Sequence, residues 1–212
     1  MRSRVVAQVL CVMILTTAAG CGGKPAETNN RQTPRKAAIS LMHLLSEREP
    51  KNMKSGKELR EFFAKDANPA YVDALASVYD ATKKLRKAAY EQLGKDNALQ
   101  IEGDGPVVED IKAYEAAEET ISGDSATLKL PSGQALNFRK EGQEWKIVPT
   151  DEDAKAAAQV LKPWAEALDA KAEQLKRPED QRDQQYRGDK DKIAAAIRTD
   201  LQGTRQSLLQ GK

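Results

Sequence analysis

The spacing of apolar residues changes twice along the chain, and this change constrains the fold more than any other feature of the sequence. Over residues 34–93, apolar side chains recur every three or four positions, which is the period of an amphipathic helix. From Ala116 to Ile147 they alternate with polar residues, as in strands that bury one face. The helical period returns after Thr150. The sequence therefore predicts an α+β fold of N-terminal helices, a small antiparallel β-meander of three to four strands, and C-terminal helices.

Capping residues mark the first predicted helices. Thr33 and Pro34 provide a cap followed by a proline at the first helical position, and this helix is predicted to run to about Arg48. Ser55 and Glu58 have the spacing of a capping box, which predicts a short helix.

The longest predicted helix begins at Asn68-Pro69 and ends at Gly94. Its apolar face follows heptad spacing and comprises Tyr71, Leu75, Val78, Thr82, Leu85 and Ala89. A coiled coil between chains usually needs three to four heptads, and this stretch holds fewer than three. We therefore favour a helix that faces the chain's own core over an intermolecular coiled coil.

The pattern between this helix and the strands is less regular. Residues 103–106 predict a turn, and Val107, Ile111 and Tyr114 suit a short helix better than a strand. Three glycine-containing turns then divide the strand region. They fall at residues 123–124, 131–133 and 141–143.

The C-terminal part is predicted to be helical with two interruptions. Pro163 lies inside the first helical pattern, so we expect a kink or a restart there. Residues 179–190 are almost entirely polar and predict a linker or an exposed helix. The last helix carries a stripe of apolar residues, Ile193, Ile197, Leu201 and Leu208. This stripe either packs on the parent domain or forms a face for a partner, which could be another protein or a second copy of the chain in a homo-oligomer.

The N-terminus has the anatomy of a signal peptide. Arg2 and Arg4 form a short positive region, and an apolar run from Val5 to Leu15 follows. The weakly polar and small residues after this run lead to Cys21. The stretch from Val5 to Gly20 is too short to cross a bilayer as a helix, which takes roughly 20 residues.

The segment Ala18-Ala19-Gly20-Cys21 resembles the lipobox of a bacterial lipoprotein. This resemblance implies cleavage before Cys21 and acylation of its sulfur, so that acyl chains hold the protein on a membrane. It predicts a signal peptide at 1–20, a lipidated cysteine and flexible tether at 21–33, an α+β domain at 34–149 and a C-terminal helical extension at 150–212. The expected location is the extracytoplasmic side of the cell envelope. Gly22 favours an outer membrane if the cell has one.

Composition excludes several kinds of chemistry. The chain has 34 Lys and Arg against 32 Asp and Glu, and removing Arg2 and Arg4 with the signal peptide makes the two equal in number. A balanced chain does not predict nucleic-acid binding. Cys11 leaves with the signal peptide, so Cys21 has no partner for a disulfide. With His43 as the only histidine, we expect no histidine-rich or cysteine-rich zinc site. Separately, we expect no cofactor and no catalytic residue.

The middle of the chain resembles the terminal hairpins of nuclear-transport-factor-2-like, or cystatin-like cone, domains. The resemblance rests on residues 123–128 and 136–138 and on Gly142-x-x-Trp145-Lys146-Ile147. It implies a cone-like fold with a pocket lined by Trp145 and Phe138.

Two functional hypotheses follow. The first is a lipid-anchored extracytoplasmic protein whose domain binds or interacts without catalysing a reaction. The alternative is a small-ligand-binding or carboxylate-dependent enzymatic pocket in the cone-like fold.

Overall fold

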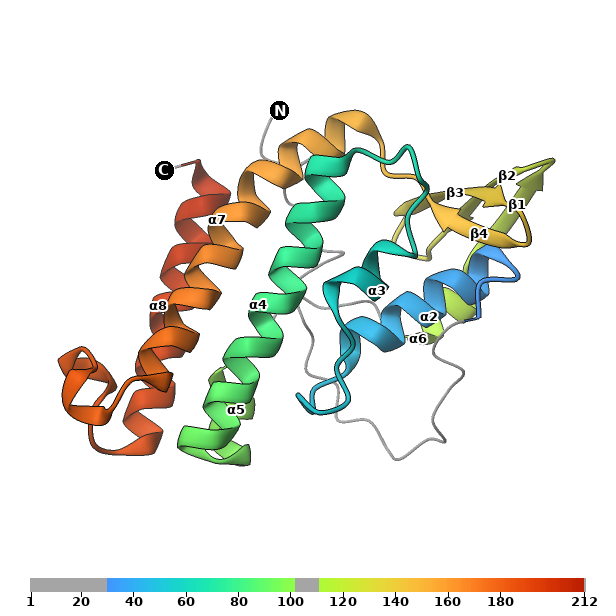
Figure 1. Ribbon diagram of the computed structural model, residues 1–212. Helices are drawn as coiled ribbons and strands as arrows, with labels where there is room; N and C mark the ends of the chain where they lie inside the picture. Colours follow the sequence, from blue (N-terminus) through green and yellow to red (C-terminus); the bar gives the residue numbers. More distant parts are fainter. Residues whose placement is uncertain (1–29, 102–110, 212) are drawn as a thin grey trace.

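The structure of the chain is a computed structural model that describes residues 30–101 and 111–211 (Figure 1). In sequence order, an antiparallel sheet follows the N-terminal helices and precedes the C-terminal helices, so the predicted α+β class is confirmed. The helices are α2 (Pro34–Ser46), α3 (Gly56–Arg60), α4 (Pro69–Leu93), α5 (Lys95–Ile101), α6 (Ile111–Glu115), α7 (Asp151–Lys176) and α8 (Lys190–Gln210). The strands are β1 (Glu118–Ser122), β2 (Ser125–Lys129), β3 (Ala135–Glu141) and β4 (Glu144–Ile147). None of the helices in these two ranges combines the length and the apolar character that crossing a membrane requires.

The predicted capping residues start the helices. The side chain of Thr33 accepts a hydrogen bond from the backbone N–H of Lys36 at 3.1 Å. Ser55 and Glu58 form both hydrogen bonds of a capping box. The side chain of Asn68 accepts from two backbone N–H groups in the first turn of α4. These bonds satisfy donors that a helix N-terminus otherwise leaves without partners.

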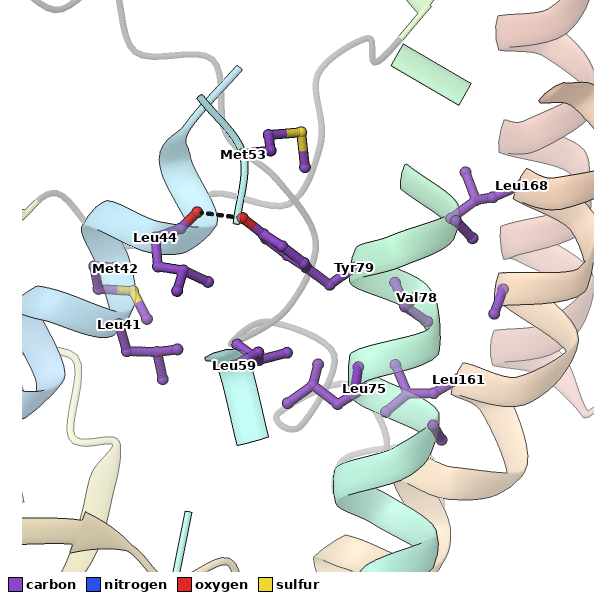
Figure 2. Packing of buried hydrophobic residues seen from close by; sticks show 14 of the residues in the cluster. Leu41, Met42, Leu44, Met53, Leu59, Leu75, Val78, Tyr79, Leu161 and Leu168 are labelled. Atoms are coloured by element: carbon purple, nitrogen blue, oxygen red, sulfur yellow. Dashed lines mark hydrogen bonds between the residues drawn. The ribbon is translucent and has the colours of Figure 1, made fainter. Parts of the chain in front are cut away.

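Helix α4 lies in the middle of the molecule, between α7 and α8 on one side and α2 and α3 on the other (Figure 1). One side of α4 packs along α7, and the other side faces α3 and α2. Figure 2 shows Leu75 and Val78 of α4 between Leu59 of α3 and Leu161 of α7. The heptad residues of α4 are thus buried in the chain's own core, as the sequence analysis favoured.

The four strands form a meander in the order β1-β2-β3-β4. Leu128 on β2, Phe138 on β3 and Trp145 on β4 are buried in the core. The outer edge of β4 is covered, because Trp145 N–H donates to the carbonyl of Arg31 at 2.8 Å and Ile147 N–H donates to that of Phe62. Strand β1 forms the opposite edge, and Ile121 there is 54% exposed.

The predicted tether at 21–33 contributes its last four residues to the folded part. Asn30 N–H donates to Ser40 Oγ, and Ser40 Oγ donates back to the Asn30 carbonyl, both at 3.1 Å. The guanidinium of Arg31 is buried, lies 5.2 Å from the centre of the Phe62 ring and pairs with Glu144 Oε1 at 2.8 Å. Polar composition indicated a flexible segment here, but these partners come from distant parts of the sequence.

The C-terminal helices share the hydrophobic core with the rest of the chain. Buried residues from Ala37 to Leu201 form a single cluster. Helix α7 continues through Pro163, so no restart occurs, and its axis turns along its length in Figure 1. A proline inside a helix removes one backbone hydrogen bond and bends the helix, which the packing against α4 tolerates.

Two segments that the pattern left open are also assigned. Helix α5 follows Gly94, whose positive φ of 88° breaks the helix between Leu93 and Lys95. Helix α6 contains Ile111 and Tyr114 and is the short helix expected there; Val107, assigned to the same helix, lies outside the described residues.

Candidate functional site

Trp145 and Phe138, predicted to line a pocket, are both core residues. They lie on adjacent strands and on the same face of the sheet, since Phe138 pairs with Ile147 and Lys140 pairs with Trp145. Trp145 is 5% exposed and Phe138 is 2% exposed. Both therefore contribute to the packing between the sheet and the helices.

The predicted partner face on the last helix is buried for most of its length. Ile193, Ile197 and Leu201 on α8 belong to the main core cluster, and Ile197 has no exposed surface. Leu208 is half-buried and packs against Val160 of α7. The stripe therefore packs on the parent domain, which is one of the two arrangements that the sequence left open.

The remaining candidate residues, Cys21 and His43, do not form a site within the described part of the chain. Cys21 lies outside the described residues. His43 is half-buried on α2, and its backbone carbonyl accepts a hydrogen bond from Ser46 Oγ. In residues 30–101 and 111–211, no group of three or more His, Cys, Asp or Glu side chains could hold a metal ion.

The polar segment 179–190 is built quite differently from a linker. It contains two short 3-10 helices, η1 (Glu179–Gln181) and η2 (Gln184–Tyr186). Tyr186 is only 1% exposed, and Arg182 is 7% exposed. Tyr186 is the one aromatic residue of this segment, and it was the sequence signal for an anchored rather than a free chain.

The buried Tyr186 is the centre of a half-buried polar network between α7 and α8. Lys171 Nζ donates to Tyr186 Oη at 2.6 Å and to Asp200 Oδ2 at 2.7 Å. Tyr186 Oη donates to the same carboxylate, and Gln185 Nε2 donates to it at 3.2 Å. Lys171 Nζ also lies 5.0 Å from the centre of the Tyr186 ring. These contacts fix the segment between the two helices.

The pKa shifts in this network are those of a structural ion pair. Burial alone would lower the pKa of Lys171, but its hydrogen bonds to Asp200 and Tyr186 outweigh burial and raise it. Burial and the bond to Asp200 raise the pKa of Tyr186. Burial alone would raise the pKa of Asp200, but the bonds from Lys171 and Tyr186 lower it. An amine nucleophile or a tyrosinate base would need its pKa lowered, so these directions oppose catalysis by either group.

The C-terminal part of the chain also contains a pocket of about 380 Å³. The ends of α4 and α7, the segment 178–188 and the first turn of α8 surround it. The charged residues in its wall are Lys176, Arg177, Glu179, Arg182 and Lys190. Four of the five are basic, in a chain that is balanced overall. The sequence analysis did not identify this pocket, because its walls come from segments up to about a hundred positions apart.

Arg182 holds the pocket wall together through backbone and amide acceptors. Its Nε donates to the Arg177 carbonyl at 3.0 Å. Its Nη2 donates to the Leu175 carbonyl at 2.9 Å and to Gln92 Oε1 at 2.8 Å. The side chain therefore joins the end of α7 to the last turns of α4.

Comparison with known proteins identifies no relative: no family model, curated protein or solved structure matches the chain.

Proposed function

We propose that the protein is a bacterial lipoprotein, anchored outside the cytoplasm through acyl chains on Cys21, whose folded part is a non-enzymatic binding domain. The observation that carries this proposal is the N-terminal sequence, in which a positive start, a short apolar run and small residues precede Cys21. Several acyl chains on one cysteine hold a protein stably on a membrane. No part of the folded domain then has to enter the bilayer.

The placement of the first folded residues fits an anchor at Cys21. Arg31 is held by Glu144 and lies over Phe62, so the chain is attached to the domain from this point onward. Nine residue steps separate Cys21 from Asn30, which span at most about 30 Å when fully extended. The start of α2 and the sheet would thus lie close to the membrane surface.

The shifted pKa values of several polar side chains have structural causes. Lys171, Tyr186 and Asp200 have pKa shifts in the directions that stabilise an ion pair. The hydroxyl of Tyr79 is buried and donates to the Leu44 carbonyl at 3.2 Å, and burial raises its pKa to about 12 (Figure 2). Each of these groups holds the fold in one arrangement.

The anchoring is tested by replacing each cysteine in turn in a bacterial host that is fed radiolabelled palmitate. Cys21→Ser should abolish labelling of the protein and release it from membranes, because the acylated sulfur is lost. Cys11→Ser is the matched control and should retain both labelling and membrane association, since Cys11 lies in the segment that is removed. Equal labelling of the two variants, or membrane association of Cys21→Ser, would contradict the proposal.

A further inference from the structure

We infer that the pocket between α4, α7 and α8 binds a small anion that carries phosphate or carboxylate groups. This inference names a ligand class for the binding role proposed above, and in that sense it rests on the proposed function. The pocket itself is defined by residues of the described domain alone. Three features of the pocket support the inference: uncompensated charge, a buried guanidinium and the position of one lysine.

The first observation is the excess of positive charge in the pocket wall. Lys176 is paired with Glu173 at 2.7 Å. Arg177 and Lys190, however, form no ion pair within the part of the chain that the structure describes. Glu179 is the only acidic residue in the wall, and its Oε1 accepts a hydrogen bond from Gly188 N–H at 2.7 Å. A concave surface with cations in excess concentrates anions from solution.

The second observation concerns Arg182, which is 7% exposed. All three of its hydrogen bonds go to neutral oxygens, and they involve only Nε and Nη2. Among the described residues, Nη1 has no hydrogen-bond partner and no carboxylate pairs with the guanidinium. A buried cation is costly unless an anion compensates its charge. A bound phosphate or carboxylate at Nη1 would supply that compensation, and a guanidinium suits both groups geometrically.

The third observation is the position of Lys190, which the usual preference for cations at helix C-termini does not explain. Basic residues at the end of α7 are favourable there, since the C-terminus of a helix attracts cations. This accounts for Lys176 and Arg177. Lys190, in contrast, is the first residue of α8, where the helix field disfavours a cation. An anion held beside Lys190 would make its position favourable as well.

The location of the pocket within the molecule limits which anions can reach it. In Figure 1 the ends of α4 and α7 lie at the opposite end of the molecule from the sheet and the start of α2. An anchor attached through Asn30 would hold the sheet end near its membrane. The pocket would then face away from that membrane, toward anions in solution or toward headgroups of an apposed surface.

The experiment is calorimetric titration of the full-length lipidated protein, in non-ionic detergent at constant ionic strength, with inorganic phosphate and with citrate. Arg177→Gln and Lys190→Gln should each weaken binding by about threefold to tenfold, because each removes one cation from the wall. Glu179→Gln should tighten binding by a similar factor, since the amide oxygen can still accept from Gly188 while the repelling charge is gone. Lys162→Gln is the matched control: it makes the same charge change on α7, about 20 Å along the helix from Lys176, and should leave binding unchanged.

The outcomes decide the inference in both directions. Absence of saturable binding by either anion up to about 10 mM, or equal affinities in all four variants, would overturn it. Vesicles containing phosphatidylglycerol, compared with phosphatidylcholine vesicles and mixed without detergent with the Cys21→Ser chain, which carries no acyl anchor, distinguish the two sources. Vesicle binding that phosphate displaces identifies a lipid headgroup, whereas phosphate or citrate binding without vesicle binding identifies a soluble anion. These titrations do not depend on where the protein resides, so a failed Cys21→Ser result and a failed anion site are told apart.

Discussion

At the residue scale, single buried polar groups decide how the C-terminal part is held. Tyr186 lies in a segment that is otherwise polar, and no local pattern indicates its partners. The fold brings Lys171 and Asp200, which are 29 positions apart, onto its hydroxyl. A half-buried network of this kind contributes most when every member has its partners. Removal of Asp200 takes one acceptor from both Lys171 and Tyr186.

Asp200→Asn tests this network through its dependence on pH. The pKa of Asp200 is lowered below its ordinary value of 3.8, so its charge stabilises the fold fully above about pH 4 and ceases to do so as the pH falls through the folded-state pKa. We expect the variant to lose about 1–2 kcal/mol of unfolding free energy at pH 7 and to approach the wild type in acid. Urea titrations at both pH values measure the difference. Asp169→Asn, which removes an exposed ion pair with Lys84, is the control and should cost less than about 1 kcal/mol. A loss in Asp200→Asn that persists in acid would show that the carboxylate charge is not responsible.

Replacing Gly56 and Gly203 with alanine should change the stability of the protein in opposite directions. A Cβ on Gly56 would lie 2.6 Å from Asp80 Oδ2 and 2.7 Å from the Ala76 carbonyl, so Gly56→Ala should destabilise the protein by about 1–3 kcal/mol. Gly203 lies inside α8 with open space around it, so Gly203→Ala should stabilise the protein by about 0.5–1 kcal/mol. Thermal unfolding of both variants checks the signs. Equal shifts in Tm would contradict the close approach of α3 to α4.

At the element scale, α8 belongs to the domain rather than standing apart from it. Its apolar stripe was compatible with a partner face or with packing on the parent domain, since periodicity shows that a face is apolar but not what covers it. Ile193, Ile197 and Leu201 are covered by the chain itself. The contacts of α8 with α5 and α7 provide that cover.

Deletion of residues 188–212 tests the role of this helix. The deletion removes the buried side chains of Ile193, Ile197 and Leu201, each worth about 2–5 kcal/mol on truncation, and their sum exceeds the net stability of most domains. We expect loss of cooperative unfolding and rapid proteolysis. Deletion of only 207–212 is the control, because Leu208 and Leu209 there are half-buried and pack on Val160 outside the main cluster. If the protein still unfolds cooperatively without residues 188–212, α8 is a separable extension and the prediction is wrong.

At the scale of the whole molecule, a single core connects the sheet to the helices. It extends from Ala37 on α2 to Leu201 on α8, with α4 at its centre (Figure 2). The molecule is elongated, with the sheet at one end and the basic pocket at the other (Figure 1). With the anchor proposed at Cys21, this arrangement gives the protein a membrane-proximal end and a distal end with a candidate binding site.

The sequence by itself determined the class of fold, the starts of the main helices and the number of strands within one. These depend on local physics: capping side chains at Thr33, Ser55 and Asn68, and the period of the apolar residues. The N-terminal pattern that ends at Cys21 is also local, and it supports the proposed anchoring without reference to the fold.

Only the tertiary structure decided what each apolar face covers and which charges meet. The resemblance to cone-like domains implied that Trp145 and Phe138 line a pocket, but the packing of the sheet on the helices buries both. The pocket at Arg182 brings together the ends of α4 and α7 and the start of α8. The spacing of apolar residues within each helix does not predict this contact between helices. Charge–charge and packing contacts between distant segments depend on how the chain closes on itself, so they emerge only when the whole core is assembled.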